Sequence, residues 1–292
     1  MKTRIILIVH FLILTFLTLN AQDKKYNGYI NDTHVHLRYE SESPYRDGRT
    51  ALPKDLIRNY NQSKYKRVGV IVMAPTNNIE KTKAQNDSVI AFCKRHSKFY
   101  PICSVHPNDE KLALDEIERL AKLGVKFLKL HSITQDFDVA SSNVSSIVQK
   151  CTENKMIILF DGLNPFDPAQ NGKFLMLALQ NPESRMIIAH MGGADFHDFA
   201  ILIALNKLKW FPQNIWFDLS GISDIYADSP YEDQIVWTCR KIGIEHILYG
   251  SDFPYTTPED AITDTQNLGF TDDELSKIFY ENSEKLFNSF KK

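Results

Sequence analysis

Short apolar runs rich in valine, isoleucine and phenylalanine recur along the chain at a nearly regular interval. After the first 21 residues, eight such runs begin near residues 29, 67, 99, 125, 156, 185, 215 and 246. Each run is four to nine residues long, which is typical of strands that are buried on both faces. Their starts lie 38, 32, 26, 31, 29, 30 and 31 residues apart, so each gap has room for one helix. Strands that alternate with helices predict a parallel sheet.

The gaps between the runs carry helical patterns. We expect a helix from Asp109, because apolar positions within residues 113–121 follow helical spacing and Gly124 stands where a C-terminal cap belongs. A second apolar stripe covers residues 174–179, and residues 271–290 begin with acidic residues and are followed by two lysines, as the helix dipole favours. Eight strand–helix units predict a (β/α)8 barrel, or TIM barrel. An open doubly wound sheet is the alternative, but no GxGxxG or GxxxxGK[ST] loop supports it.

The first 21 residues follow a different pattern. Lys2 and Arg4 precede an apolar stretch that runs to Leu19, and small and polar residues follow. This is the layout of a secretory signal peptide, and the stretch falls short of the roughly 20 apolar residues that span a membrane. We therefore expect residues 1–21 to be removed on export to the periplasm or the outside of the cell. Residues 22–292 should then form one barrel domain without a membrane anchor.

Composition and charge narrow the class of protein. The chain has 292 residues, of which 43% are hydrophobic and 24% charged, and this excludes a disordered or collagen-like protein. The formal net charge is −2 and no basic run occurs outside the N-terminus, so we expect no nucleic-acid partner. The four cysteines are scattered without CxxC spacing, and we expect single buried thiols.

The first strand ends in a pair of histidines. It reads Asp32-Thr33-His34-Val35-His36, and side chains alternate across a strand. Asp32, His34 and His36 therefore share one face, and the two imidazoles are close enough to bind one divalent ion. In a TIM barrel this C-terminal end of the strands carries the chemistry.

Other predicted strands also end in ionisable residues. The fourth gives Lys129 and His131, the sixth gives His190 and the eighth gives Asp252. Such groups are costly to bury unless they are paired or bound to a metal. The set therefore predicts a metal site, and the alternative is a set of polar groups satisfied within the core. Nitrogen ligands with a carboxylate suit Zn²⁺, and also Mn²⁺ or Fe²⁺.

Four motifs in this order resemble a known family: DTHVHL, KLH, IIAHMGG and YGSDFP, at the first, fourth, sixth and eighth strands. The chain resembles the amidohydrolase superfamily, in particular the amidohydrolase-related (amidohydrolase 2) group of metal-dependent TIM-barrel hydrolases. The resemblance runs from about Tyr29 to the C-terminus. The superfamily includes hydrolases of amides, lactones and esters as well as decarboxylases, so the resemblance does not select a substrate.

The resemblance implies roles for individual residues. His34 and His36 would be metal ligands, and Asp252 would be both a ligand and the base that takes a proton from a metal-activated water. His190 would be a further ligand or a group that polarises the substrate. Relatives usually have a histidine ligand at the end of the fifth strand, where this chain has Asp161. Asp161 would then be an oxygen ligand, or the site would have one protein ligand fewer.

The resemblance also bears on the number of ions. In two-metal relatives a lysine on the fourth strand is carboxylated and bridges the ions, whereas an unmodified lysine can hold a substrate carboxylate. Without the fifth-strand histidine we favour a single divalent ion, with Zn²⁺ as the first choice. Lys129 then joins Asp252 and His190 as a catalytic residue. We expect His131, His106 and Asp161 to contact the substrate at the barrel mouth.

The favoured function is a metal-dependent hydrolase that cleaves a C–N or C–O bond of a small, polar or carboxylate-bearing substrate. A metal-dependent decarboxylase on the same barrel and an inactive exported binding protein are the alternatives. No GxSxG motif supports a serine hydrolase. The segment from Arg38 to Pro53 is a candidate lid or a plain surface loop, and a homo-oligomer remains open.

Overall fold

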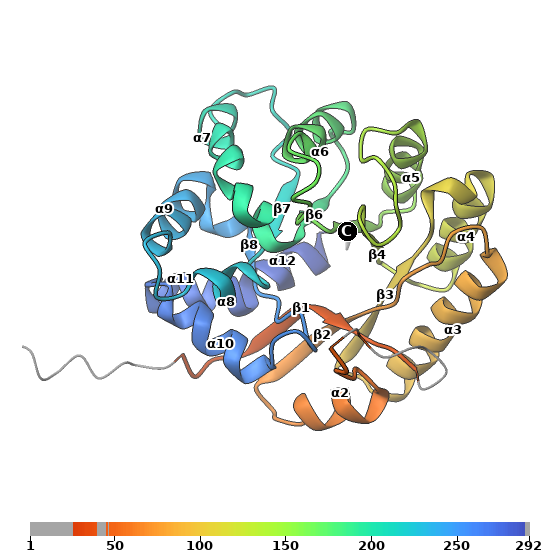
Figure 1. Ribbon diagram of the computed structural model, residues 1–292, viewed down its shortest axis with the longest axis horizontal. Helices are drawn as coiled ribbons and strands as arrows, with labels where there is room; N and C mark the ends of the chain where they lie inside the picture. The colour runs from red at the N-terminus through yellow and green to blue at the C-terminus, as the bar shows by residue number, and fades with distance from the viewer. Residues whose placement is uncertain (1–25, 40–44, 46, 290–292) are drawn as a thin grey trace, which may run out of the picture.

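Eight parallel strands pair in chain order around a barrel (Figure 1). The computed structural model describes residues 26–39, 45 and 47–289, so the predicted signal peptide lies outside the described residues. The strands are β1 (Ile30–His36), β2 (Tyr65–Ile71), β3 (Phe99–Ser104), β4 (Phe127–Leu130), β5 (Ile157–Phe160), β6 (Met186–Ile188), β7 (Ile215–Asp218) and β8 (Ile247–Leu248). Each contains residues of one of the eight apolar runs, so the predicted TIM barrel is confirmed.

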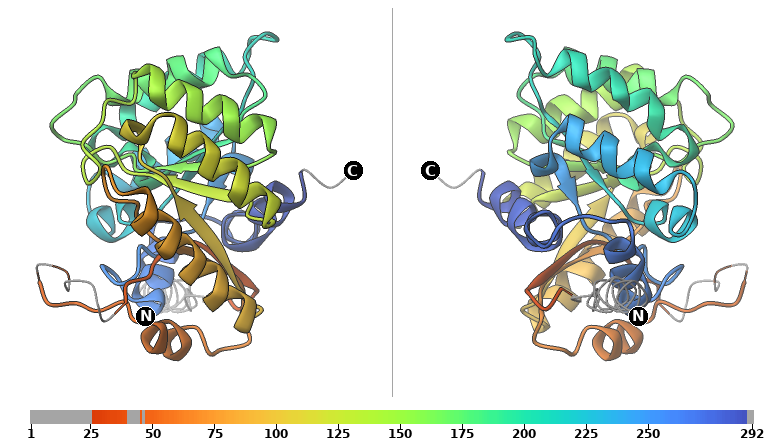
Figure 2. Two further views of the ribbon diagram at one scale, coloured as in Figure 1. Left: turned by 90° about the vertical axis from the view of Figure 1, so that its right-hand side faces the viewer. Right: turned by 90° about the vertical axis from the view of Figure 1, so that its left-hand side faces the viewer.

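Helices surround the barrel and cover its outer face (Figures 1 and 2). The α-helices are α2 (Pro53–Asn59), α3 (Ile79–Arg95), α4 (Lys111–Lys122), α5 (Ser142–Glu153), α6 (Gln170–Gln180), α7 (Leu202–Leu205), α8 (Ile222–Tyr226), α9 (Glu232–Ile242), α10 (Pro258–Asn267), α11 (Asp272–Ser276) and α12 (Asn282–Asn288). Shorter 3₁₀ or π segments are η1 (Pro107–Asp109), η2 (Ala189–Ile201), η3 (Ile244–His246) and η4 (Lys277–Glu281). Within the described part of the chain, none of these helices is long and apolar enough to cross a membrane.

Two of the predicted helices differ from their expected form. Gly124 follows α4 with a φ of 86°, as expected of a C-terminal glycine, but a separate 3₁₀ turn precedes this helix and Glu110 has a φ of 47°. The predicted helix over residues 271–290 is divided into α11, the π turn η4 and α12. The four cysteines are free and buried, which confirms that expectation.

The barrel closes between its first and last strands through a short join. Val35 forms an isolated parallel bridge with Phe253, just beyond β8. The amide of His36 donates to the Phe253 carbonyl at 2.8 Å, and the amide of Asp252 donates to the His34 carbonyl at 2.9 Å. The join between β1 and the segment after β8 therefore lies among the residues predicted to hold the metal.

The interior of the barrel is apolar, and α12 covers its end (Figure 2). Inward residues of the strands form a buried cluster that includes Leu159 and Leu248, and Leu286 of α12 packs into the same cluster. The ring of Phe287 lies 4.5 Å from the ring of Tyr100 and 4.8 Å from that of Phe127, centroid to centroid. This end of the barrel is thus sealed by side chains, and the polar residues of the strand ends lie at the other end, the mouth.

Candidate metal centre

Two histidines of β1 meet an aspartate that follows β8. The Nε2 atom of His36 lies 2.9 Å from Oδ1 of Asp252, and Nε2 of His34 lies 3.5 Å from the same oxygen. His34 is fully buried, whereas the side chains of His36 and Asp252 are 15% and 14% exposed. These three residues offer two nitrogens and one oxygen within 4.8 Å of one another, and their role as ligands stays a prediction. The structure therefore brings together donors that could hold one ion.

Asp218, at the end of β7, fixes the orientation of His34. Its Oδ2 lies 3.1 Å from Nδ1 of His34, and its Oδ1 accepts hydrogen bonds from the amides of His190 and Ser220 at 3.1 Å each. Burial raises the pKa of Asp218, but the interactions with His34 act in the opposite direction, and the net shift of the pKa is downward. An ionised carboxylate at Nδ1 keeps the proton of His34 on that nitrogen and leaves Nε2 free to bind a metal.

His34 is suited to be a neutral ligand. Burial lowers its pKa to about 4, and the nearby Lys129 acts in the same direction. Burial raises the pKa of Asp252, but its hydrogen bond to His36 and its interactions with the neighbouring histidines outweigh this effect, so the net shift is downward. Two imidazoles and an ionised carboxylate are a donor set that divalent transition ions accept. The residues present therefore fit a single ion.

The sequence analysis did not identify Asp218 as a functional residue. The sequence does carry a signal for it, because Asp218 is a charged residue at the end of the seventh apolar run. Lys129 and Asp252 were selected by the same criterion. His34, His190 and Asp218 form a second group of three potential ligands within 4.8 Å among the described residues. Because Asp218 contacts Nδ1 of His34, whereas Asp252 lies near Nε2, we interpret Asp218 as an orienting residue.

Asp32 ties β1 to the segment that carries Asp252. Its carboxylate accepts hydrogen bonds from the Tyr60 hydroxyl at 2.7 Å and from the Ser251 amide at 3.1 Å. Burial raises the pKa of Asp32 to about 6 although these hydrogen bonds oppose the shift. Asp32 belongs to neither group of potential ligands, and its contacts hold the two sides of the barrel join together.

Asp161, at the end of β5, lies among three nitrogen donors. Its Oδ2 is 3.3 Å from Nε2 of His131, 3.4 Å from Nε2 of His190 and 3.5 Å from Nζ of Lys129. Burial raises the pKa of Asp161, but these three residues lower it well below its usual range. Its Oδ1 accepts from the Leu163 amide at 3.1 Å. Both carboxylate oxygens are therefore in contact with the protein.

His190 and His131 differ in charge although both contact Asp161. Burial alone would lower the pKa of His190, but the charge of Asp161 and a hydrogen bond to it raise the pKa to about 9. Nδ1 of His190 lies 2.8 Å from the Ser220 carbonyl, so both ring nitrogens can donate. Burial lowers the pKa of His131 to about 4, which leaves that ring neutral. His190 is thus a proton donor in this arrangement, and its role as a ligand stays a prediction.

His106 is held by the loops around it. The ring is fully buried, and its Nε2 lies 2.6 Å from both the Thr76 hydroxyl and the Gln135 carbonyl. Its Nδ1 accepts from the Asn108 amide at 3.1 Å. These contacts join the loops after β2, β3 and β4. The expected contact between His106 and substrate stays a prediction.

An aromatic side chain borders the centre on the side of His36. The ring of Tyr255 lies 6.1 Å from the ring of His36 and 5.2 Å from that of Tyr45. Arg49 donates to the Tyr255 carbonyl. The described part of the predicted lid therefore contacts the segment after β8, while residues 40–44 and 46 lie outside the described residues.

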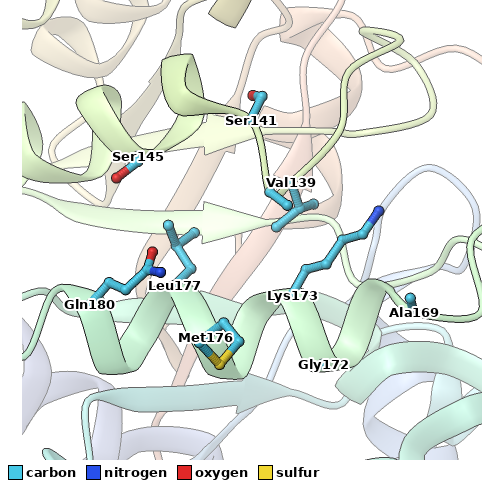
Figure 3. Close-up of a pocket in the computed structure, with 10 residues that line it drawn as sticks. Val139, Ser141, Ser145, Ala169, Gly172, Lys173, Met176, Leu177 and Gln180 are labelled. Carbon is cyan, nitrogen blue, oxygen red and sulfur yellow. The ribbon is translucent and has the colours of Figure 1, made fainter.

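A separate groove lies on the outside of the barrel. It has a volume of about 400 Å³ between α5 and α6, and Figure 3 shows Lys173, Met176 and Leu177 projecting from α6 beside it. Lys173 is paired with Asp138 at 2.8 Å and Asp167 at 2.7 Å. None of the candidate ligands lines this groove.

Solved structures with the same fold include several decarboxylases. The 5-carboxyvanillate decarboxylase of Novosphingobium aromaticivorans, complexed with manganese, is 15% identical with a TM-score of 0.68, and the match covers 90% of this chain and 97% of that one. The 2,6-dihydroxybenzoate decarboxylase of Rhizobium is 13% identical with a TM-score of 0.69, and the match covers 90% of this chain and 99% of that one. A structure described as a candidate amidohydrolase from Staphylococcus aureus is 19% identical with a TM-score of 0.66, and the match covers 88% of this chain and 99% of that one. These likenesses show the fold.

Sequence comparison identifies the family. No curated protein sequence matches this chain. The family model described as amidohydrolase matches residues 32–288, a span that begins at Asp32 and includes both histidines of β1 and Asp252. The chain therefore belongs to the amidohydrolase family, a group of metal-dependent TIM-barrel enzymes.

Proposed function

We propose that this protein is a metal-dependent decarboxylase of a small, carboxylate-bearing substrate. The observation that carries this proposal is the position of Lys129. Its ammonium group is fully buried, and its Nζ lies 3.4 Å from Nε2 of the candidate ligand His34. A buried cation beside the metal centre is suited to bind an anionic group of the substrate.

The side chains around Lys129 fit the requirements of decarboxylation. The reaction replaces the bond between carbon and CO₂ with a bond to hydrogen, so the substrate carbon must receive a proton. His190, with a proton on each ring nitrogen, is the donor that we assign to this step. Asp161 holds His190 and Lys129 in place through contacts of 3.4 and 3.5 Å. When bound, a divalent ion supplies a Lewis acid that polarises an oxygen of the substrate.

The similar structures support this choice over hydrolysis, which the sequence analysis favoured. Two of those described above are decarboxylases of aromatic acids, and one contains manganese. We therefore propose Mn²⁺ as the ion to test first, in place of the Zn²⁺ that the sequence analysis preferred. We keep export as the proposed location of the protein on the basis of residues 1–21.

Hydrolysis is the second candidate because of Asp252. Its pKa is lowered from the usual value, and its side chain is 14% exposed, so the ionised carboxylate can be reached by water. A carboxylate in this state can accept a proton from a water molecule that attacks a carbonyl carbon. The product distinguishes the two reactions, because hydrolysis incorporates an oxygen atom of water and decarboxylation does not.

The test is an assay of the Mn²⁺-loaded protein with 5-carboxyvanillate and 2,6-dihydroxybenzoate in isotopically labelled water. We expect release of CO₂ in equal amount to the decarboxylated product, without label in the product carboxyl or hydroxyl groups. The variant Asp252→Asn serves as the inactive control. Labelled oxygen in the product of an ester or amide panel, without CO₂ release from any carboxylic acid, would support hydrolysis instead.

A further inference from the structure

The residue at the end of β5 faces nitrogen donors on several sides. Asp161 is 5% exposed, and its Oδ2 lies within 3.5 Å of nitrogen atoms from Lys129, His131 and His190. The amide of Leu163 donates to its other oxygen. A buried carboxylate with this many donors is already compensated without a metal ion.

Asp161 also lies apart from the candidate ligands. Two groups of three potential ligand atoms fall within 4.8 Å of one another in the described part of the chain, and Asp161 belongs to neither. Lys129 contacts both Asp161 and the candidate ligand His34, and His190 also lies beside both of them. The Nζ of Lys129 is 3.5 Å from Oδ2 of Asp161 and 3.4 Å from Nε2 of His34.

Lys129 requires a counter-charge where it lies. Its side chain has no exposed surface, and a buried ammonium is strongly unfavourable unless a carboxylate compensates it. Of the carboxylates near the centre, Asp161 is the one in an ion pair with Lys129, whereas Asp252 pairs with His34 and His36. Asp161 therefore compensates the charge of Lys129, and Asp252 remains beside the two candidate histidine ligands.

We propose that this chain holds its ion with three protein ligands, His34, His36 and Asp252, and that Asp161 is the counter-ion of Lys129 and not a ligand. The Lys129–Asp161 pair occupies the β5 side of the centre. With three protein ligands, an ion would have coordination positions left for a substrate, and Lys129, which lies 3.4 Å from Nε2 of His34, could contact an anionic group of that substrate. This inference rests on the metal dependence in the proposed function and does not depend on which reaction is catalysed.

The positive charge of Lys129 should lower the affinity of the centre for a divalent ion. A positive charge this close to a ligand nitrogen repels a divalent ion, and the repulsion is weakly screened in a buried site. The variant Lys129→Met removes the charge and keeps an unbranched apolar side chain of similar length. We expect it to bind Mn²⁺ at least about tenfold more tightly than the unmodified protein, because one of the two cations beside Asp161 that repel the ion is removed.

The experiment is a titration of the full-length protein with Mn²⁺, in which free Mn²⁺ is followed by electron paramagnetic resonance. We expect Asp161→Asn to bind one ion with an affinity reduced by less than about tenfold, and His36→Ala to lose about a hundredfold or more. Asp138→Asn, which removes a carboxylate at the α5–α6 groove, is the matched control. The visible spectrum of the Co²⁺-loaded protein should be the same in Asp161→Asn as in the unmodified protein.

Two results would overturn the proposal. One is a loss of affinity in Asp161→Asn that equals the loss in His36→Ala, and the other is a changed Co²⁺ spectrum in Asp161→Asn. If Asp161→Asn does not fold, the double variant Lys129→Met/Asp161→Leu removes both charges of the pair, and His190, whose pKa is raised by Asp161, can lose its proton. It should bind Mn²⁺ at least as tightly as the unmodified protein, and weaker binding would count against the proposal. Absence of turnover in every assay would contradict the proposed function and leave these binding results unaffected.

Discussion

The two ends of the barrel are built from the same strands but have opposite character. At the mouth, charged or ionisable residues contact one another within about 3.5 Å. They lie at the ends of β1, β4, β5 and β7 and in the segment after β8. At the other end, aromatic rings and Leu286 of α12 fill the interior. This fold therefore separates the groups that do chemistry from those that supply stability. Substitutions at each end should therefore change different measurements.

The largest effect is expected at the mouth, for Asp252→Asn. The amide carries no charge, so it holds a divalent ion more weakly than the ionised carboxylate does, and in hydrolysis it could not accept the proton of a water molecule. We expect turnover to fall by about a thousandfold, while the midpoint of urea unfolding stays near that of the unmodified protein. Steady-state assays of the Mn²⁺-loaded protein and urea titrations measure the two quantities. Full activity would contradict the assignment of Asp252 as a metal ligand and, for hydrolysis, as the base.

A substitution at the closed end should give the opposite result. Leu286→Ala removes a side chain that is 4% exposed and that packs into the barrel interior. We expect a loss of about 2 to 5 kcal/mol in the free energy of unfolding, with the affinity for Mn²⁺ unchanged in the folded protein. Leu112→Ala on α4, where the leucine is 52% exposed, is the control and should change stability by less than about 0.5 kcal/mol. Weakened Mn²⁺ binding in Leu286→Ala would show that the two ends are coupled.

A smaller effect is expected for Asp218→Asn, behind the metal centre. The amide can accept the hydrogen bond from His34 or donate to it, so the imidazole is no longer held in one tautomer. We expect the affinity for Mn²⁺ to fall about 10- to 100-fold. Titration calorimetry of Asp218→Asn and of the unmodified protein measures the change. An unaltered affinity would mean that the barrel holds His34 in place without Asp218.

The smallest effect is expected for an ion pair that belongs to neither end. Glu274 contacts Arg240 at 2.7 Å on the outer surface, and this hydrogen bond lowers the pKa of Glu274 to about 2. Because the pKa is lower in the folded state, the pair stabilises the protein above the ordinary pKa of about 4.5, and this contribution is lost as the pH falls toward 2. Since Arg240 is 42% exposed, we expect less than about 1 kcal/mol. Urea unfolding of Glu274→Gln should differ from the unmodified protein at about pH 7 but hardly at about pH 2.

The order of strands and the residues at their ends could be predicted from the sequence, because both follow from local patterns. The apolar runs locate the strands, and the structure places His34, His36 and Asp252 together at the mouth. The same pattern does not distinguish His106 from His34, since both follow apolar runs. Their difference depends on partners distant in the sequence: Gln135 and Thr76 for one, and Asp218 for the other.

The pairing of Lys129 with Asp161 could not be predicted for the same reason. Each residue alone suits a role at a metal centre, and only their separation of 3.5 Å indicates that they compensate each other. The division of residues 271–290 into two helices with a π turn between them also escaped prediction. Its helical pattern is continuous in the sequence, whereas in the structure the carbonyl of Ile278 in the π turn accepts a hydrogen bond from the amide of Tyr249, a residue distant in the sequence, at 3.1 Å.

The short join between β1 and the segment after β8 has a consequence for unfolding. His34 and His36 lie on one side of this join and Asp252 on the other, so an ion bound by all three would cross-link the first strand to the last. Thermal denaturation would then have to break these coordination bonds, and the melting temperature should rise with the concentration of free metal.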